Sequence, residues 1–394
     1  MKTKFNMGLL PKVLIAIACG IGVGMFAPMW LARIFATFNA VFSEFLGFVI
    51  PLLIVGFVAP AIFEIGTKAG RMLVVTALIA YAMTFASGMM SYFISELTFP
   101  SMITPDAYIA SQSDAAAVLP YFTVEIEPLM NVMTALVLAF VLGLCLSAID
   151  SPALKNVLID FRKVINLTIG KVIIPLLPLY IFGIFLSMTI TGEVSAMLKT
   201  FAGIIAIIFA MHVALLVLQY VIGSFFSGLN PFKALWRMMP AYFTALGTQS
   251  SAATIPVTLR QTVALGVDKE TAGFVIPLCA TIHMSGSTLK IVACALALMI
   301  THSMPYSTPM FAGFIAMLGI TIVAAPGVPG GAIMASLGLL SSMLGFTDAD
   351  NALMIALYIA MDSFGTACNV TGDGAIAQIV ARIFRHPNVR RNNI

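Results

Sequence analysis

Two carboxylates, a hydroxyl and an amide recur along one short apolar stretch near the C-terminus. Asp362, Thr366, Asn369 and Asp373 stand at positions i, i+4, i+7 and i+11, so on a helix they form one line along one face. Two acids on an apolar helix are costly unless they meet a cation, a polar ligand or each other. The stripe therefore predicts a buried site for a cation or a polar solute. The competing interpretation is a pair of carboxylates satisfied by neighbouring helices.

The chain around this stripe has the composition of a polytopic membrane protein. Of its 394 residues, 60% are hydrophobic and 9% are charged, whereas soluble domains carry roughly 25% charge. Nearly uncharged apolar runs of about 18 residues or more recur from end to end, as membrane-spanning helices require. The net charge of +4 is explained by basic cytoplasmic loops and implies no nucleic-acid partner. The cysteines fall in apolar segments without metal-ligand spacing, as small buried hydrophobic residues do: Cys19, Cys145, Cys279, Cys294 and Cys368.

The first 230 residues predict ordinary membrane spans. The second span is expected to be broken by Pro51 and Pro60, a short amphipathic linker precedes the fifth, and the sixth is conventional. Basic residues gather at both termini and in alternate loops, whereas the loop 98–127 is acidic without one Lys or Arg. Positive-inside counting therefore predicts that both termini are cytoplasmic. The expected spans are 9–31, 38–63, 72–97, 128–149, 165–191 and 198–226.

The remaining chain contains interrupted apolar segments. Residues 234–264 are broken by the small polar run 247–256, and residues 307–343 are broken by the Pro/Gly run 326–331. Such segments make poor straight spans but good re-entrant hairpins with tips buried in protein. A helix with polar residues at mid-depth follows each hairpin. Two such units predict a transporter with an internal repeat and a binding site at the membrane midplane.

These motifs resemble those of the dicarboxylate/amino acid:cation symporters, a family that includes the glutamate transporters and the bacterial serine/threonine transporter. Residues 250–257 resemble its first hairpin tip, 276–286 its seventh helix and 327–332 its second hairpin tip, while 369–373 match its eighth-helix signature. The resemblance implies an all-α protein with eight transmembrane helices and two re-entrant hairpins in inverted repeats. It also implies an elevator mechanism and a homotrimer in the bacterial inner membrane. The scaffold would comprise residues 1–71 and 128–196, and the transport domain 72–127 and 197–394.

The resemblance also implies roles for residues of the stripe. Asp362 matches the acid that holds the substrate's amino group, and Asn369 matches the amide near its α-carboxylate. The hairpin tips would present free N–H groups to that carboxylate. The further positions that the resemblance assigns to the substrate pocket are Ser250, Ser251, Ser287, Lys290, Val328, Gly330, Gly365 and Thr366.

Two sodium sites are implied by the same resemblance, and no organic cofactor is expected. Sodium suits the donors, which are hard oxygen atoms apart from one methionine sulfur. The first site would use Asp373 with carbonyl groups near Cys279, His283 and Asn369. The second would use Thr281 and Met284 with the carbonyl groups of Ile322, Val323 and Ala325.

A third cation site of the family has lost its acidic ligand in this chain. The positions of its seventh-helix asparagine and aspartate are His283 and Ser285, while Tyr81 and Thr84 remain in the third span. Without the carboxylate we expect no sodium there, and hence fewer coupled sodium ions than in glutamate transporters. Because an imidazole ordinarily titrates near neutral pH, His283 also raises proton coupling as an alternative. A neutral histidine hydrogen-bonded in the core is the competing interpretation.

The substrate is indicated by departures from the family pattern. Gly365 and Gln249 stand where members with acidic substrates have arginines, which favours a small neutral amino acid such as serine, threonine or alanine. Lys290 stands where the family usually has a tyrosine, and it could reach into the space that Gly365 leaves. The alternative is therefore a dicarboxylate or acidic amino acid clamped by Lys290. An ion pair with Asp362, or snorkelling out of the bundle, are the structural interpretations of this lysine.

Two other function classes fit the sequence less well. An intramembrane aspartyl protease expects Gly-x-Gly-Asp, but Asp373 follows Val370-Thr371-Gly372 and shares one helix with Asp362. There is no His-Glu-x-x-His zinc motif, so we expect no enzymatic activity. A channel is disfavoured because paired hairpins imply gated access to an enclosed site. The expected partners are therefore a small solute, membrane lipid and further copies of the chain.

Overall fold

The computed structural model describes residues 9–67, 70–103, 118–192, 194–323 and 330–384. Helices account for most of these residues, and no strand occurs among them. This agrees with the all-α class that the apolar runs predict. The helices fall into two groups that differ in which neighbours they contact.

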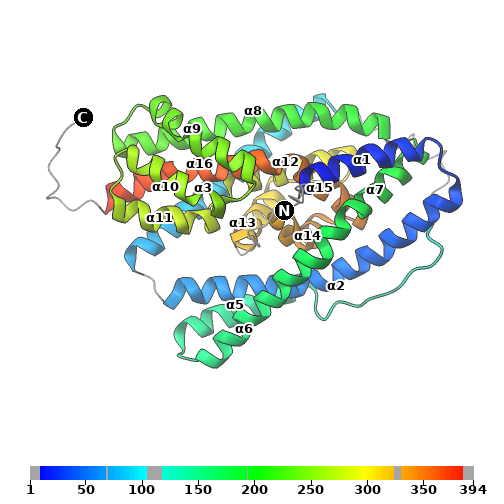
Figure 1. Cartoon of the computed structure of the whole chain (residues 1–394), viewed down its shortest axis with the longest axis horizontal. Coiled ribbons are helices and arrows are strands. Elements are labelled where there is room, and N and C mark those ends of the chain that lie inside the picture. The colour runs from blue at the N-terminus through cyan, green and yellow to red at the C-terminus, as the bar shows by residue number, and fades with distance from the viewer. Residues whose placement is uncertain (1–8, 68–69, 104–117, 193, 324–329, 385–394) are drawn as a thin grey trace, which may run out of the picture.

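The first group contains α1 (Leu9–Gly24), α2 (Met29–Thr67), α5 (Val132–Ala148), α6 (Pro152–Thr168) and α7 (Ile174–Ile190). Helix α2 packs against α5, α6 and α7, and α1 packs against α7. In Figure 1 the blue α2 and the teal α5 and α6 form the lower edge of the molecule.

Three details of this group differ from the predicted spans. Helix α1 ends at Gly24, before the predicted end of the first span, and α2 begins after Pro28, whose carbonyl accepts from the backbone N–H groups of Leu31 and Ala32. Helix α2 runs unbroken through Pro51 and Pro60, so neither proline ends the helix although each lacks the N–H for one backbone hydrogen bond. The predicted linker before the fifth span is α6 itself, joined to α7 by a π-helical turn.

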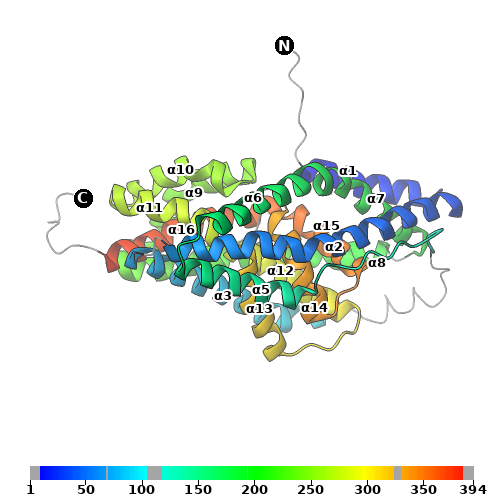
Figure 2. The same cartoon turned by 90° about the horizontal axis from the view of Figure 1, so that it is seen from below.

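The second group surrounds α16 (Asp362–Ile383), which contacts α3, α8, α9, α10, α11 and α12. Figure 1 shows the orange-to-red α16 running among these helices in one half of the molecule, and Figure 2 shows the same half from below. The other members are α3 (Arg71–Thr98), the short η1 (Phe99–Ser101), α8 (Val194–Ser227), α9 (Pro231–Thr248), α10 (Ser251–Ala264), α11 (Lys269–Ile282), α12 (Ser285–Thr301), α13 (Thr308–Val323), α14 (Gly331–Leu344) and α15 (Asp348–Ala360).

Helix breaks fall where the sequence predicts interruptions. Between α9 and α10 the chain turns at Gln249, whose φ of 53° is left-handed, and α11 gives way to α12 at His283 and Met284. Helices α9 and α10 pack against each other, as do α13 and α14. Helices α10, α13 and α14 have 14, 16 and 14 residues, fewer than the roughly 20 that cross a bilayer. Helices α15 and α16 meet at a 62° bend.

The chain is a multi-pass membrane protein, although fewer helices are of full spanning length than predicted. Within the described residues, five are long and apolar enough to cross a membrane, or six if the bent α15–α16 pair counts as one. The apolar helices Pro11–Gly24 and Val137–Ala148 are shorter, and they correspond to the predicted first and fourth spans. The five long segments are Met29–Pro60, Arg71–Ser101, Pro152–Ile190, Phe201–Ser227 and Lys269–Thr301.

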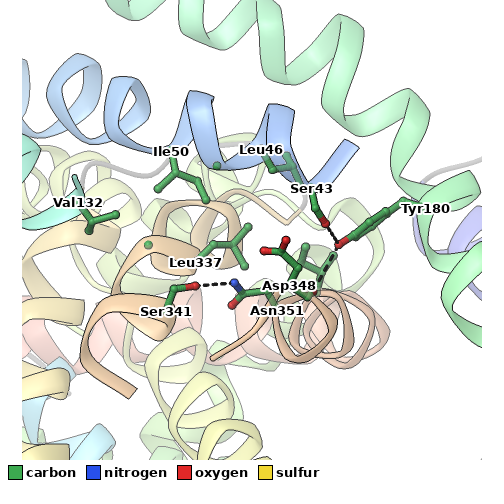
Figure 3. Close-up of a pocket in the computed structure, with 12 residues that line it drawn as sticks. Ser43, Leu46, Ile50, Val132, Tyr180, Leu337, Ser341, Asp348 and Asn351 are labelled. Atoms are coloured by element: carbon green, nitrogen blue, oxygen red, sulfur yellow. Dashed lines mark hydrogen bonds between the residues drawn. The ribbon is translucent and has the colours of Figure 1, made fainter. Parts of the chain in front are cut away.

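A small cavity lies where α2, α5 and α7 meet α14 and α15. Its volume is about 120 Å³, and Figure 3 shows Asp348 and Asn351 facing Ser43 and Tyr180 across it. The Ser43 and Tyr180 hydroxyl groups are 2.8 Å apart, and Leu46, Ile50 and Leu337 supply apolar wall. The two helix groups thus meet here partly over apolar side chains and partly over polar groups, since the Tyr180 hydroxyl also donates to the carbonyl oxygen of Asp348 at 3.4 Å.

Candidate functional site

The polar stripe lies on α16 and is buried along its whole length. Asp362, Thr366, Asn369 and Asp373 all belong to the buried set, and every residue of the facing helix α12 is buried too. The two helices approach closely at Gly286, which has no side chain: a Cβ there would lie only 2.6 Å from the carbonyl oxygen of Gly365. The polar groups of α12 and α16 must therefore satisfy one another or a ligand, since water has no access to them.

Asp362 is held at both carboxylate oxygens. Lys290 of α12 donates from Nζ to Oδ1 at 2.9 Å, and the backbone N–H of Gly330, just before α14, donates to Oδ2 at 2.8 Å. Lys290 is fully buried. Its Nζ also lies 3.4 Å from the ring centroid of Tyr358 and 3.5 Å from the carbonyl oxygens of Tyr358 and Met361. A carboxylate, an aromatic face and two carbonyls at the end of α15 thus surround this ammonium group.

Gly365 provides the room for this lysine. A Cβ at position 365 would lie 2.9 Å from both Cε and Nζ of Lys290, closer than real Cβ contacts come. The sequence left open whether Lys290 pairs with Asp362 or reaches the space above Gly365. In the structure it does both.

Asn369 connects α16 to the start of α12. Its Oδ1 accepts from the Gly286 N–H at 2.7 Å, and its Nδ2 donates to the Ser287 hydroxyl at 3.1 Å. Ser287 also accepts from the Tyr358 hydroxyl at 3.1 Å. Thr366 is buried one turn before Asn369 on the same face. The structure thus brings Asp362, Thr366, Asn369, Ser287 and Lys290 together.

Asp373 pairs with a histidine at the α11–α12 break. His283 Nδ1 lies 2.9 Å from Asp373 Oδ1 and 3.2 Å from the carbonyl oxygen of Asn369. Its Nε2 lies 2.6 Å from the Ser285 hydroxyl and 3.3 Å from Gln219 Nε2 of α8. Both acids of the stripe are therefore matched by basic side chains that lie seven residues apart in the sequence.

The tip between α9 and α10 reaches the first turn of α16. Gln249 donates from Nε2 to the Ser363 hydroxyl at 3.3 Å. Ser250 caps α10, accepting from the N–H of Ala253 at 3.2 Å, and Ser251 is the first residue of that helix. The positive N-terminal ends of α10, α14 and α16 thus lie near one another around Asp362 and Ser363, an arrangement that favours a carboxylate.

The groups of the predicted second sodium site lie at helix ends. Thr281 is exposed near the end of α11, Met284 follows the break, and Ile322 and Val323 close α13, which contacts α11. Carbonyl groups at helix C-termini carry partial negative charge and suit a cation. Ala325 of this set and Val328 of the substrate set lie outside the described residues.

The remains of the third cation site are engaged in internal hydrogen bonds. Thr84 accepts from the Met284 N–H at 3.3 Å, Tyr81 donates to the carbonyl of Ala316 at 3.0 Å, and Ser285 contacts His283. These polar groups serve the packing of α3 against α12 and α13.

Sequence reasoning missed three residues of this site. Gln219 and His212 lie on α8, which the sequence presents as a conventional span, and they contact His283 and the Gly286 carbonyl at 3.3 and 3.1 Å. Their separation of seven residues puts both on one face of an apolar helix, a signal that could have found them. Tyr358 carried no such signal, because its ring and hydroxyl act across helices.

The chain is similar to known transporters over most of its length. Residues 9–383 match the Sodium:dicarboxylate symporter family. The serine/threonine transporter SstT of Acinetobacter baumannii is 27% identical over 389 residues, which cover 93% of this chain and 95% of the relative. An excitatory amino acid transporter of Caenorhabditis elegans is 26% identical over 266 residues, 66% of this chain and 52% of that protein. All these relatives are transporters rather than enzymes. The chain belongs to the Sodium:dicarboxylate symporter family.

Proposed function

We propose that the protein is a secondary active symporter that couples sodium entry to uptake of a small neutral amino acid. The observation that supports a neutral solute is the set of groups that surround the Lys290 side chain. Its ammonium group is surrounded by Asp362, two carbonyls and the Tyr358 ring, so it is not free to clamp a carboxylate on the solute's side chain. With Gly365 and Gln249 in place of basic residues, no uncommitted cation faces the stripe within the described part of the chain.

The solute's two charged groups have candidate partners. A solute ammonium group can replace the Gly330 N–H as donor to Asp362 Oδ2, while Lys290 keeps Oδ1. The solute carboxylate would face the N-termini of α10 and α14, with Ser250, Ser251, Val328 and Gly330 as the proposed contacts. The base of this proposed pocket would be formed by Ser287, Thr366 and Asn369.

A dicarboxylate or an acidic amino acid is the second candidate. The observation that favours it is the position of Lys290 directly over Gly365, where a side-chain carboxylate of the solute could exchange for Asp362. With a dicarboxylate, which brings no ammonium group to Asp362, this exchange would leave a buried carboxylate unpaired, at a cost of about 3–5 kcal/mol. We therefore rank the neutral solute first.

Sodium binding is proposed for the second set of donors, Thr281, Met284, Ile322, Val323 and Ala325. The support is that Thr281 and Val323 lie in the last turns of α11 and α13, two helices in contact, where backbone carbonyls carry partial negative charge. Coupling then means that bound sodium and bound solute each raise the affinity for the other by the same factor.

Movement is proposed to follow the elevator pattern, with residues 72–127 and 197–394 carrying the site past residues 1–71 and 128–196. The partly apolar contact and small cavity between the two helix groups support a sliding boundary (Figure 3). The two hairpins, the inverted repeat, a homotrimer in the bacterial inner membrane and cytoplasmic termini belong to the same proposal. The basic loops and the family resemblance support them.

Thermal stabilisation of the purified protein tests the solute class and the coupling together. We expect serine, threonine or alanine to raise the melting temperature in sodium, and to do so much less when choline replaces sodium. Aspartate and succinate should have little effect in either salt. Stabilisation by succinate and not by serine would overturn the neutral pocket, and equal stabilisation in both salts would overturn sodium coupling.

A further inference from the structure

The oxygen atoms expected to form the first sodium site are already engaged by another residue of the chain. Two oxygen atoms expected to face the ion, Asp373 Oδ1 and the carbonyl oxygen of Asn369, lie 2.9 and 3.2 Å from the same nitrogen, Nδ1 of His283. A third, the carbonyl of Cys279, accepts the backbone N–H of His283 at 2.9 Å. One residue therefore engages the set that would hold the cation.

The proton on Nδ1 follows from its surroundings. A carboxylate and a carbonyl can only accept hydrogen bonds, so Nδ1 must be a donor towards both. This holds for the neutral Nδ1–H tautomer and for the imidazolium, because both carry a proton on Nδ1. That nitrogen offers no lone pair to sodium, and its N–H points at the oxygens that a hard cation would use.

The imidazole ring is fixed from several sides. Ser285 and Gln219 contact its Nε2 at 2.6 and 3.3 Å, and the residue is 1% exposed. Gly372 of α16 leaves room for the ring, since a Cβ there would lie 2.6 Å from His283 Cε1. Swinging the ring away would leave Asp373 buried without a partner, because the only charged group that it contacts among the described residues is His283.

We propose that His283 is a built-in counter-group for Asp373 and takes the place of the cation expected at this position. The inference rests on the proposed symport function and narrows it, because sodium would then couple through the second set of donors alone. It assigns His283 as the residue that sets the number of sodium ions bound per solute.

Sodium binding to the purified chain without solute tests this assignment. Radiolabelled sodium and sodium-dependent melting curves, with choline holding the ionic strength constant, would be compared for the wild type, His283→Asn and the double variant His283→Asn/Asp373→Asn. Asparagine removes the imidazole and supplies an amide oxygen. We expect His283→Asn to bind one additional sodium ion per chain, and the double variant to lose it again.

A second histidine–aspartate pair, partly buried, provides the control. His302 Nδ1 lies 2.8 Å from Asp350 Oδ1, away from the stripe, so His302→Asn should bind as much sodium as the wild type. Equal sodium binding by His283→Asn and the wild type, with both proteins folded and monodisperse, would overturn the proposal. So would a gain of sodium binding in His302→Asn.

A single variant keeps the test decisive if His283→Asn does not fold. In Asp373→Asn alone, we expect the sodium concentration for half-maximal stabilisation to stay within about twofold of the wild type, because Asp373 is not a ligand. A weakening of about tenfold or more, equivalent to about 1.4 kcal/mol, would identify Asp373 as a sodium ligand and overturn the inference. These measurements use no solute. Their outcome therefore does not depend on whether a transported amino acid is found, and the two proposals can fail separately.

Discussion

At the scale of single residues, the site is defined by two basic side chains that stand opposite two acids. Lys290 pairs with Asp362 and His283 pairs with Asp373, at 2.9 Å in each case. The family resemblance implies that these acids would face a solute amine and a sodium ion. This chain supplies positive or proton-donating groups of its own at both positions, and the proposals of a neutral solute and of a single set of sodium donors depend on them.

Removal of the Lys290 ammonium group tests the first of these pairs. Lys290→Met leaves Asp362 buried without its ion-pair partner, so we expect a loss of about 3–5 kcal/mol in the free energy of unfolding. Thermal unfolding in detergent measures it. Lys163→Met is the matched control, because that lysine pairs with Asp160 on the surface and should change little. Equal effects of the two variants would contradict a structural role for the buried pair.

Moving the positive charge from position 290 to position 365 tests whether this charge decides which solute binds. In the double variant Lys290→Tyr/Gly365→Arg, the guanidinium would extend from α16 and would no longer be held by the carbonyl groups at the end of α15. We expect aspartate to bind at least about tenfold more tightly than to the wild type, a change of about 1.4 kcal/mol, and serine to lose its advantage. Solute-dependent melting curves report both. An unchanged preference for serine would show that the charge at this position does not determine which solute binds.

At the scale of helices, much could be predicted from the sequence. The breaks at Gln249, at His283–Met284 and before α14 follow from small polar residues, glycine and proline within apolar runs. Pairings across helices could not be predicted, because Lys290 with Asp362 and His283 with Asp373 depend on how α12 meets α16. The predicted break of the second span at Pro51 and Pro60 was wrong, because α2 is continuous through both residues and local proline chemistry does not reveal what packs around the ring.

The α12–α16 contact carries a prediction of its own. In Gly286→Ala the new methyl group would lie 2.6 Å from the Gly365 carbonyl oxygen and 2.8 Å from Cys368 Cβ, and backbone cannot move aside as a side chain can. We expect a loss of about 1–3 kcal/mol in unfolding free energy, together with weaker solute binding. Gly273→Ala on α11 meets nothing within 4 Å and serves as control. Equal melting temperatures for the two variants would contradict this close approach.

At the scale of the whole molecule, the proposed sliding boundary can be locked. A Cβ on Gly338 of α14 would lie 2.7 Å from Ile50 Cγ2 of α2, so cysteines at these positions should form a disulfide. We expect oxidised Ile50→Cys/Gly338→Cys to bind solute without transporting it, and reduction to restore uptake. The single variants are controls, in a background with the exposed Cys19 and Cys145 changed to serine. Undiminished uptake by the cross-linked protein would contradict the elevator proposal.

The central claim is concentrative, sodium-driven uptake of a small neutral amino acid. It is tested most directly with the purified protein in liposomes, with sodium and proton gradients imposed separately and labelled serine, alanine, aspartate and succinate supplied in turn. The account predicts that an inward sodium gradient accumulates serine or alanine above the external concentration, with saturation, and that aspartate and succinate are not accumulated. Accumulation of succinate or aspartate, or serine uptake driven by a proton gradient without sodium, would contradict it.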